Sequence, residues 1–133
     1  MAVTGRFEWP AAWLAAGVFF WMAGFDILYA LADEEFDRQH GVSSVPARFG
    51  AHRACLLSRL CHATAFLFWI LFMKSVGGGT FFGFGMGTVG VLLIWEHTLV
   101  GPKRLGNLPM AFFKVNSMIS VVLLAATLGE IFV

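Results

Sequence analysis

The chain alternates long apolar segments with short polar ones. Apolar residues occupy every face of these segments, as they do from Phe66 to Met73, and this is typical of helices that contact lipid and one another. Each segment is close to the roughly 20 residues that cross a bilayer as a helix. The segments run approximately over residues 9–32, 54–73, 80–100 and 110–133. The pattern predicts an all-α, polytopic transmembrane helical bundle of about four spans, forming a single unit over residues 1–133.

Composition supports this assignment. Of the 133 residues, 59% are hydrophobic and 13% are charged, and the mean hydropathy is +0.78. These values lie outside the range of ordinary soluble domains. A closed β-barrel needs short segments of alternating polarity, which the chain lacks. We therefore expect a lipid bilayer around the protein and no nucleic-acid partner.

Glycine and proline mark the ends of the segments. Gly41 follows an acidic stretch, Pro46 precedes the second segment, residues 77–79 are all glycine, and Gly101 and Pro102 end the third segment. The connections are therefore short, apart from a polar cap over residues 33–53.

Lysine and arginine gather on one side of the predicted membrane. Only Arg6 and Lys74 fall on the other side. The positive-inside rule places the basic side in the cytoplasm, so we expect a multi-pass protein of the cell inner (cytoplasmic) membrane with the polar cap on its cytoplasmic face. The basic residues on this side are Arg38, Arg48, Arg53, Arg59, Lys103, Arg104 and Lys114.

Acidic residues concentrate where the first segment ends. Asp26, Asp33 and Asp37 are separated by seven and four residues and so share a helix face, whereas Glu34 and Glu35 point elsewhere. A charge near the middle of a membrane span costs roughly 2.5 to 3.5 kcal/mol on insertion scales, so acids kept at the end of such a segment indicate a functional site. Two carboxylates one turn apart suit Mg²⁺, which commonly binds one or two carboxylates together with substrate phosphates.

Three arginines follow the acids closely enough in sequence to bind a diphosphate, namely Arg38, Arg48 and Arg53. The alternative is that the acids only pair with these arginines in a solvated cap and set the topology of the chain. Asp26 argues against that alternative, because it lies too deep in the apolar segment to be ordinary loop charge.

The stretch from Asp26 to Gly50, D-x-x-Y-A-x-x-D-x-E-F-D-R-x-x-G-V-x-S-x-P-x-R-F-G, resembles the second aspartate-rich motif of the UbiA-type aromatic prenyltransferases. The pattern E-H-x-L-V-x-P from Glu96 and the pattern A-F-F-x-V-N from Ala111 resemble the 4-hydroxybenzoate polyprenyltransferase branch and its menaquinone-pathway relatives. The resemblance covers nearly the whole chain. It implies the last four of about nine membrane helices, the C-terminal part of that fold.

The resemblance implies transfer of a polyprenyl group from polyprenyl diphosphate to an aromatic acid such as 4-hydroxybenzoate, in ubiquinone or menaquinone biosynthesis. Asp33 and Asp37 match the family's D-x-x-x-D and would hold Mg²⁺. Asp26 and Tyr29 match the start of the motif and would act as catalytic residues facing the cavity.

By the same argument, the arginines of the cap would contact the diphosphate. Arg48 would serve the catalytic step, and Arg38 and Arg53 would bind the departing diphosphate.

The first aspartate-rich motif of the family, N-x-x-x-D-x-x-x-D, does not occur in this sequence. Because the resemblance implies that both motifs hold the diphosphate, we expect this chain alone to be inactive. It would be a fragment, a truncated reading frame or one half of a split enzyme, with a missing N-terminal half that carries the first motif.

Two alternative functions remain. His62 and His97 lie on different segments, as in a haem or quinone-binding membrane subunit, although His97 is expected to hydrogen-bond to a neighbouring helix cap instead. The other alternative is a non-catalytic helical assembly partner.

One glycine pattern points to a cofactor only superficially. The G-x-G-x-x-G match at residues 85–90 lies in an apolar segment without a preceding strand, so it does not predict dinucleotide binding. The spacing of Gly79, Gly83 and Gly87 predicts close helix packing.

Overall fold

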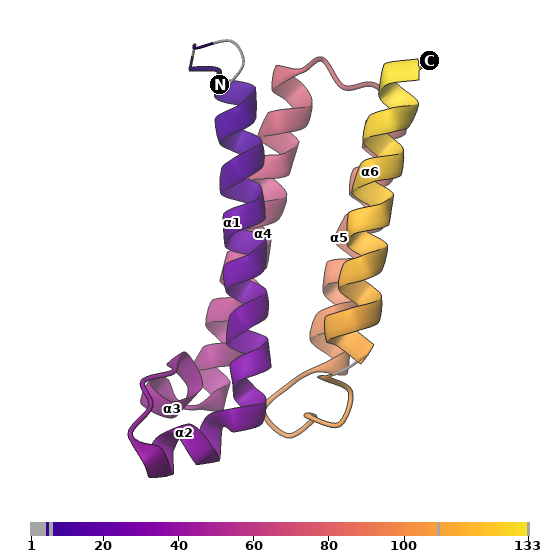
Figure 1. Cartoon of the computed structure of the whole chain (residues 1–133). Coiled ribbons are helices and arrows are strands. Elements are labelled where there is room, and N and C mark those ends of the chain that lie inside the picture. The colour runs from indigo at the N-terminus through magenta and orange to yellow at the C-terminus, as the bar shows by residue number, and fades with distance from the viewer. Residues whose placement is uncertain (1–4, 6, 109, 133) are drawn as a thin grey trace.

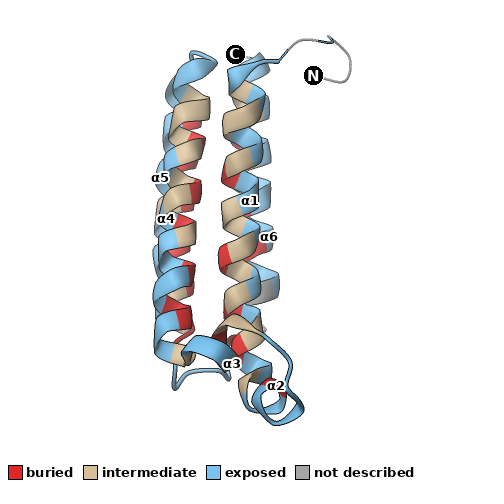
Figure 2. Ribbon diagram, turned by 90° about the vertical axis from the view of Figure 1, so that its left-hand side faces the viewer, coloured by how far each residue is buried: buried red, intermediate tan, exposed pale blue. Residues whose placement is uncertain are grey.

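Four long helices form a bundle whose axes run side by side. The computed structural model describes residues 5, 7–108 and 110–132, and these residues form no strand. In Figure 1, α1 and α4 lie on one side and α5 and α6 on the other, while Figure 2 shows α4 and α5 in one layer and α1 and α6 in the other. The all-α prediction is confirmed. The long helices are α1 (Trp9–Tyr29), α4 (Ala51–Ser75), α5 (Thr80–Leu99) and α6 (Asn116–Phe132).

Three continuous helical stretches are long and apolar enough to cross a membrane: Trp9–His40, Ala51–Ser75 and Phe113–Phe132. The chain is therefore a multi-pass membrane protein. Helix α5 has a similar length, but its glycines and the adjacent Glu96 and His97 lower its hydropathy. The fourth membrane span stays a prediction, although the helix itself is present.

The cap expected over residues 33–53 is largely helical. A 3₁₀ turn, η1 (Ala30–Asp33), extends α1 directly into α2 (Glu34–His40). A left-handed residue, Gly41 with φ of 68°, ends α2, and this conformation is one that glycine adopts without steric cost. The short helix α3 (Val45–Phe49) follows and packs on the first turns of α4. Figure 1 shows α2 and α3 together at one end of the bundle.

A wider helical turn begins the last span. Residues Met110–Val115 form a π-helical turn, η2, before the α-helix proper starts at Asn116. The sequence predicts a helix from residue 110 onward, which is correct, but it gives no sign of the π geometry.

Glycine lets α1 and α4 approach closely. The side chain of Trp69 lies against Gly17, and the ring of His62 lies against Gly24, in each case so near that a Cβ atom on the glycine would overlap it. The hydroxyl of Ser58 also donates a hydrogen bond of 2.7 Å to the carbonyl of Gly24. Close backbone contact of this kind drives association in membranes, where water does not force helices together.

Helices α5 and α6 pack through a different face from the one that the glycine spacing predicts. Gly83 and Gly87 are exposed, with nothing of the described chain within 4 Å of the position of a Cβ atom. Contact instead occurs at Gly85, which lies against Ala126 of α6. The expectation is therefore wrong for Gly83 and Gly87, because the face that α5 turns toward α6 lies two residues away from them, whereas Gly79 does contact α6 through Glu130.

A carboxylate from α6 caps the start of α5. Glu130 accepts hydrogen bonds from the backbone amides of Gly79 at 2.7 Å and Phe82 at 3.1 Å. These amides have no partner within the helix, and the negative charge also suits the positive end of the helix dipole. The contact fixes α5 and α6 at the end of the bundle opposite the cap.

The two glycine positions on α5 give a matched test of this packing. We expect Gly85→Ala to lower the free energy of unfolding by about 1–3 kcal/mol, because the new methyl group must push α6 away. Gly87→Ala meets open space and should be neutral or stabilising by up to about 1 kcal/mol, since alanine favours the helix. Circular dichroism during unfolding in mixed detergent and dodecyl sulfate micelles measures both. Equal effects of the two variants would contradict the observed α5 and α6 contact.

Candidate functional site

The two aspartates of the predicted metal site lie four residues apart, Asp33 at the end of η1 and Asp37 in α2. Asp33 is exposed at the N-terminal end of α2, and Asp37 is buried with 9% of its surface exposed. Neither carboxylate forms an ion pair or a hydrogen bond with the described residues. The alternative in which the acids only pair with nearby arginines therefore finds no support at these two positions.

The donor set fits Mg²⁺ bound together with a substrate. Two oxygen donors on adjacent turns are too few for a cage made of protein alone, and the described residues contain no group of three or more histidine, cysteine, aspartate or glutamate side chains placed to hold a metal. Mg²⁺ commonly keeps several waters and completes its shell with phosphate oxygens. The carboxylates of Asp33 and Asp37 are free to supply the protein's part of such a shell.

The 3₁₀ turn changes how Asp26 relates to these two acids. A 3₁₀ turn advances about 120° per residue instead of about 100°, so four residues rotate the following helix by roughly 80° from the phase that a continuous α-helix predicts. Asp26 is exposed on α1, about 200° around the helix from Gly24, which contacts α4. Asp26 therefore faces away from α4. The shared face expected for all three aspartates does not form as a single α-helical row.

Tyr29 lies between these acids and the interior of the bundle. It is half exposed, with 49% of its surface accessible, and it borders a void of about 10 Å³ that Glu96 of α5 also lines. A void of this size holds at most about one water molecule, so it is not a substrate pocket. Tyr29, a residue of the motif, thus lies near the buried carboxyl group of Glu96.

The structure does not gather the three predicted diphosphate-binding arginines around one hollow. Arg38 forms an ion pair with Glu34, and both line a hollow of about 550 Å³ that includes neither Arg48 nor Arg53. Arg48 is exposed on α3, with its guanidinium 5.6 Å from the centre of the Phe49 ring, and Arg53 lines a separate apolar hollow beside α3. These three arginines can therefore bind one diphosphate only if their exposed side chains rotate toward it.

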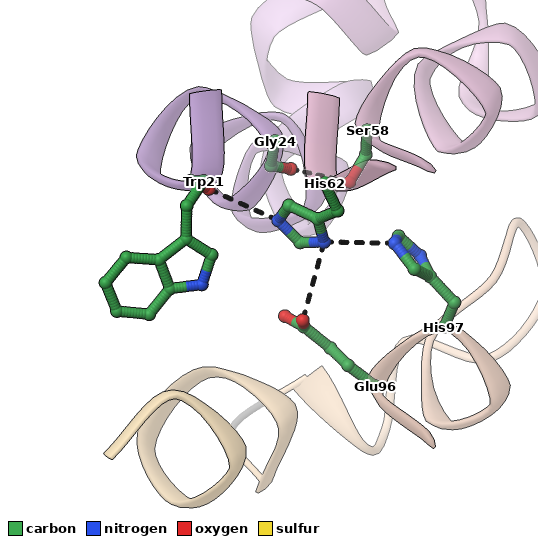
Figure 3. Close-up of polar contacts among 6 residues, drawn as sticks. All are labelled: Trp21, Gly24, Ser58, His62, Glu96 and His97. Carbon is green, nitrogen blue, oxygen red and sulfur yellow. Dashed lines mark hydrogen bonds and ion pairs between the residues drawn. The ribbon is translucent and has the colours of Figure 1, made fainter. Parts of the chain in front are cut away.

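A buried polar cluster links three helices near the middle of the bundle (Figure 3). His62 of α4 lies at its centre. Its Nε2 is 3.2 Å from the carbonyl of Trp21 on α1, and its Nδ1 is 3.0 Å from Nε2 of His97 and 3.5 Å from Oε2 of Glu96 on α5. His62 and Glu96 are only 2% and 1% exposed.

Hydrogen-bond chemistry constrains the protons of this cluster. Nε2 of His62 faces a carbonyl, which only accepts, so it carries a hydrogen and donates. The 3.5 Å separation from Glu96 is at the outer limit of a hydrogen bond, and Glu96 Oε2 has no hydrogen-bond partner among the described residues. If Glu96 were ionised and His62 neutral, the lone pair on Nδ1 of His62 would repel the carboxylate, and no group would balance its buried negative charge. The nearer partner of His62 Nδ1 is Nε2 of His97, at 3.0 Å, so the hydrogen of this bond lies between the two imidazole rings.

This geometry rules out the bis-histidine haem alternative. The rings of His62 and His97 bond to each other directly, with their centroids 5.0 Å apart, and no space for a porphyrin separates them. It also corrects the expectation that His97 bonds to a helix cap, since its partner is His62 on α4.

Sequence reasoning missed the central role of Glu96. The signal is present, because an ionisable residue inside an apolar segment indicates function or a buried partner. The partner is not readable from the sequence, because His62 is 34 residues away and its contact depends on how α4 and α5 are rotated.

Comparison with known proteins identifies the fold. A model of the UbiA prenyltransferase family matches residues 1–118 of the chain. The chain is also similar to the apo structure of a UbiA homolog from Aeropyrum pernix K1, with a TM-score of 0.77 and 28% identity over 90% of this chain and 42% of that one.

Curated relatives give the same picture at low identity. A 4-hydroxybenzoate octaprenyltransferase of Shewanella sp. (strain ANA-3) is 30% identical over 77% of this chain and 36% of its own length. The corresponding protein of Shewanella halifaxensis (strain HAW-EB4) is 27% identical over 96% of this chain and 44% of its own length. The chain therefore spans less than half the length of these relatives.

The cluster around His62 predicts a large stability effect. His62→Leu removes the partner of a buried carboxyl group, and breaking such a pair costs about 3 kcal/mol or more of unfolding free energy. The double variant His62→Leu with Glu96→Leu should recover part of that loss, since the buried carboxyl group is then gone and only His97 has lost its partner. Unfolding in mixed micelles gives the four free energies of the cycle. His40→Leu, on the exposed end of α2, is the control and should change stability by less than about 0.5 kcal/mol; a loss equal to that of His62→Leu would contradict the assignment.

Proposed function

Because the chain belongs to the UbiA prenyltransferase family, we propose that it supplies the second aspartate-rich motif of a membrane enzyme. This enzyme transfers a polyprenyl group from polyprenyl diphosphate to an aromatic acid such as 4-hydroxybenzoate, in quinone biosynthesis. The observation that carries the proposal is the pair Asp33 and Asp37, which lie four residues apart at the end of a membrane helix and whose carboxylates have no hydrogen bond or ion pair with the described residues.

Each motif residue has a task in this proposal. Asp33 and Asp37 hold Mg²⁺, and Arg38 and Arg53 bind the diphosphate after their exposed side chains turn toward it. When bound, the ion neutralises the negative charge that develops on the departing diphosphate. Arg48 adds a hydrogen-bonding cation to the same charge, which is strongest in the transition state.

The reaction that these groups serve is an aromatic alkylation. The bond between the allylic carbon and the diphosphate oxygen breaks, and the diphosphate leaves with the electron pair. A ring carbon beside the phenolic hydroxyl then bonds to the allylic carbon, and the ring releases one proton. In this proposal, Asp26 and Tyr29, on the last turns of α1, orient the aromatic acceptor as it approaches the cap.

The position of the motif suits an amphiphilic substrate. The cap follows directly from α1, so a diphosphate at Asp33 and Asp37 would leave its apolar chain at the level of the membrane helices. Arginine and lysine concentrate at this same end of the bundle, while Lys74 lies at the other end. We place this end in the cytoplasm and the protein in the inner membrane, because the basic residues follow the positive-inside rule.

A further segment completes the site in this proposal. The chain contains no N-x-x-x-D-x-x-x-D pattern, and it matches only 36% and 44% of the length of two relatives. We propose that a segment with the first aspartate-rich motif, in the same polypeptide or in another one, binds the opposite side of the diphosphate.

Substitution of the two aspartates tests the metal role. In the complete enzyme, Asp33→Asn and Asp37→Asn should each lower kcat/KM by at least about a hundredfold, because each removes a charged oxygen ligand worth several kcal/mol of charge stabilisation. The Mg²⁺ concentration for half-maximal rate should rise in the same variants. Prenylation of 4-hydroxybenzoate in proteoliposomes measures both quantities.

Glu35→Gln is the matched control for these substitutions. It removes one exposed carboxylate from the same helix, on the face away from Asp33 and Asp37, and should leave kcat/KM and Mg²⁺ dependence within about twofold of the unmodified enzyme. If prenylation and Mg²⁺ dependence survive both aspartate substitutions, the metal role is wrong.

Reconstitution tests the need for a further segment. This chain alone, in lipid with Mg²⁺, a polyprenyl diphosphate and 4-hydroxybenzoate, should form no product above background. Product should appear when a segment with the first motif is added. Robust turnover by this chain alone would disprove the requirement.

A further inference from the structure

A groove runs between α4 and α5 on a side of the bundle that the motif does not use. It consists of two hollows of about 500 Å³ and 460 Å³ that share Arg59, His97 and Thr98. We call this the α4/α5 groove. Asp26 faces away from α4, so the groove and the start of the motif lie on different sides of the four helices.

The end of the groove nearest the cap is basic. Arg59, Lys103 and Arg104 line it and are exposed, and His52 adjoins them. Within the described part of the chain, no carboxylate lines either hollow. The side chain of Arg59 has no hydrogen bond or ion pair there, and the guanidinium of Arg104 donates only one hydrogen bond, of 3.3 Å, to the carbonyl of Thr98. These cations thus lack a counter-charge, in contrast to Arg38, which pairs with Glu34.

The rest of the groove is apolar. Ala63 and Phe66 of α4 and Leu93 and Ile94 of α5 line the larger hollow. Gly90 also lines it, and the absence of a side chain there keeps the trough open beside the ring of Phe66, which a Cβ atom would approach to 3.3 Å. The groove therefore combines a cationic mouth with an apolar trough along the helices.

This polarity matches a lipid with a negatively charged head. We propose that the α4/α5 groove binds an anionic phospholipid, with its phosphate against Arg59, Lys103 and Arg104 and one acyl chain along Ala63, Phe66 and Ile94. A polyprenyl diphosphate shares this chemistry, an anionic head on an apolar chain. The groove favours the phospholipid, because none of the motif aspartates lines it and the surrounding bilayer supplies such lipids continuously.

Lipid titration of this chain tests the proposal. The 133-residue chain in maltoside micelles is titrated with dioleoylphosphatidylglycerol, dioleoylphosphatidylcholine, geranylgeranyl diphosphate or inorganic diphosphate, with thermal melting as the measurement. We expect phosphatidylglycerol to raise the melting temperature at lower concentration than the other three. Arg59→Gln and Lys103→Gln should each weaken its apparent affinity about fivefold, since one basic residue near anionic lipid contributes about that factor.

Matched variants separate the groove from general charge. Lys74→Gln removes the same charge from the same helix, but Lys74 lies at the other end of α4 and lines neither hollow, so the variant should leave the affinity within about twofold. Ala63→Trp fills the trough and should weaken binding, whereas Leu67→Trp, exposed on α4 outside the groove, should not. The ligand-free melting temperature of each variant checks its fold, and Lys103 lies in a connection where substitution leaves the helices intact.

Each other outcome would overturn the proposal. Equal responses to the two phospholipids would show that the head-group charge plays no part, and equal losses of affinity in Lys74→Gln and Arg59→Gln would show that the lipid does not bind in the groove. If only inorganic diphosphate raised the melting temperature, the groove would be a site for anions and not for a lipid. A stronger response to geranylgeranyl diphosphate, lost in Arg59→Gln, would assign the groove to the prenyl substrate. Only this last outcome also bears on where the proposed function places the diphosphate, and the substitutions of Asp33 and Asp37 test that function separately.

Discussion

The buried contacts of His62 determine how the helices of this bundle are rotated. One imidazole reaches α1 through the Trp21 carbonyl and α5 through Glu96 and His97, and its ring also fits against Gly24. In a bilayer, apolar side chains distinguish poorly between one helix face and another, because lipid is as apolar as leucine. Buried polar groups do distinguish, since each must find a partner. This cluster therefore selects one arrangement of three helices from many that would bury similar area.

The rotation has consequences on both sides of the bundle. With Gly24 against α4, Asp26 faces away from it, and Tyr29 borders the small void that Glu96 also lines. With His62 and His97 in contact, Arg59 comes to the mouth of the α4/α5 groove. The same polar cluster thus separates the motif from a second, basic surface at the same end of the protein.

No loop separates α1 from the acidic residues of the motif in the cap. The 3₁₀ turn of η1 joins α1 to α2, so Asp33 and Asp37 are held by helical backbone that continues from the membrane. A rigid support of this kind suits ligands that must bind a small ion with demanding geometry. The arginines of the cap stand on exposed positions instead, where they can follow a substrate that arrives and leaves.

The sequence alone determined the class of the protein and the extent of its helices. Runs of about twenty apolar residues cannot be satisfied in lipid except as helices, so α1, α4 and α5 end within a few residues of their predicted bounds. The D-x-x-x-D spacing likewise placed Asp33 and Asp37 one turn apart on a helix, because this relation is local.

Only the tertiary structure decided which distant parts of the chain contact one another. The helical period shows which residues share a face but not which neighbour that face meets, so the packing row predicted at Gly83 and Gly87 proved to be open while Gly85 contacts Ala126. For the same reason, the sequence did not reveal that Glu96 and His97 meet His62. Such contacts depend on the rotation of whole helices, and that rotation is set by buried polar groups from three helices together rather than by any one segment.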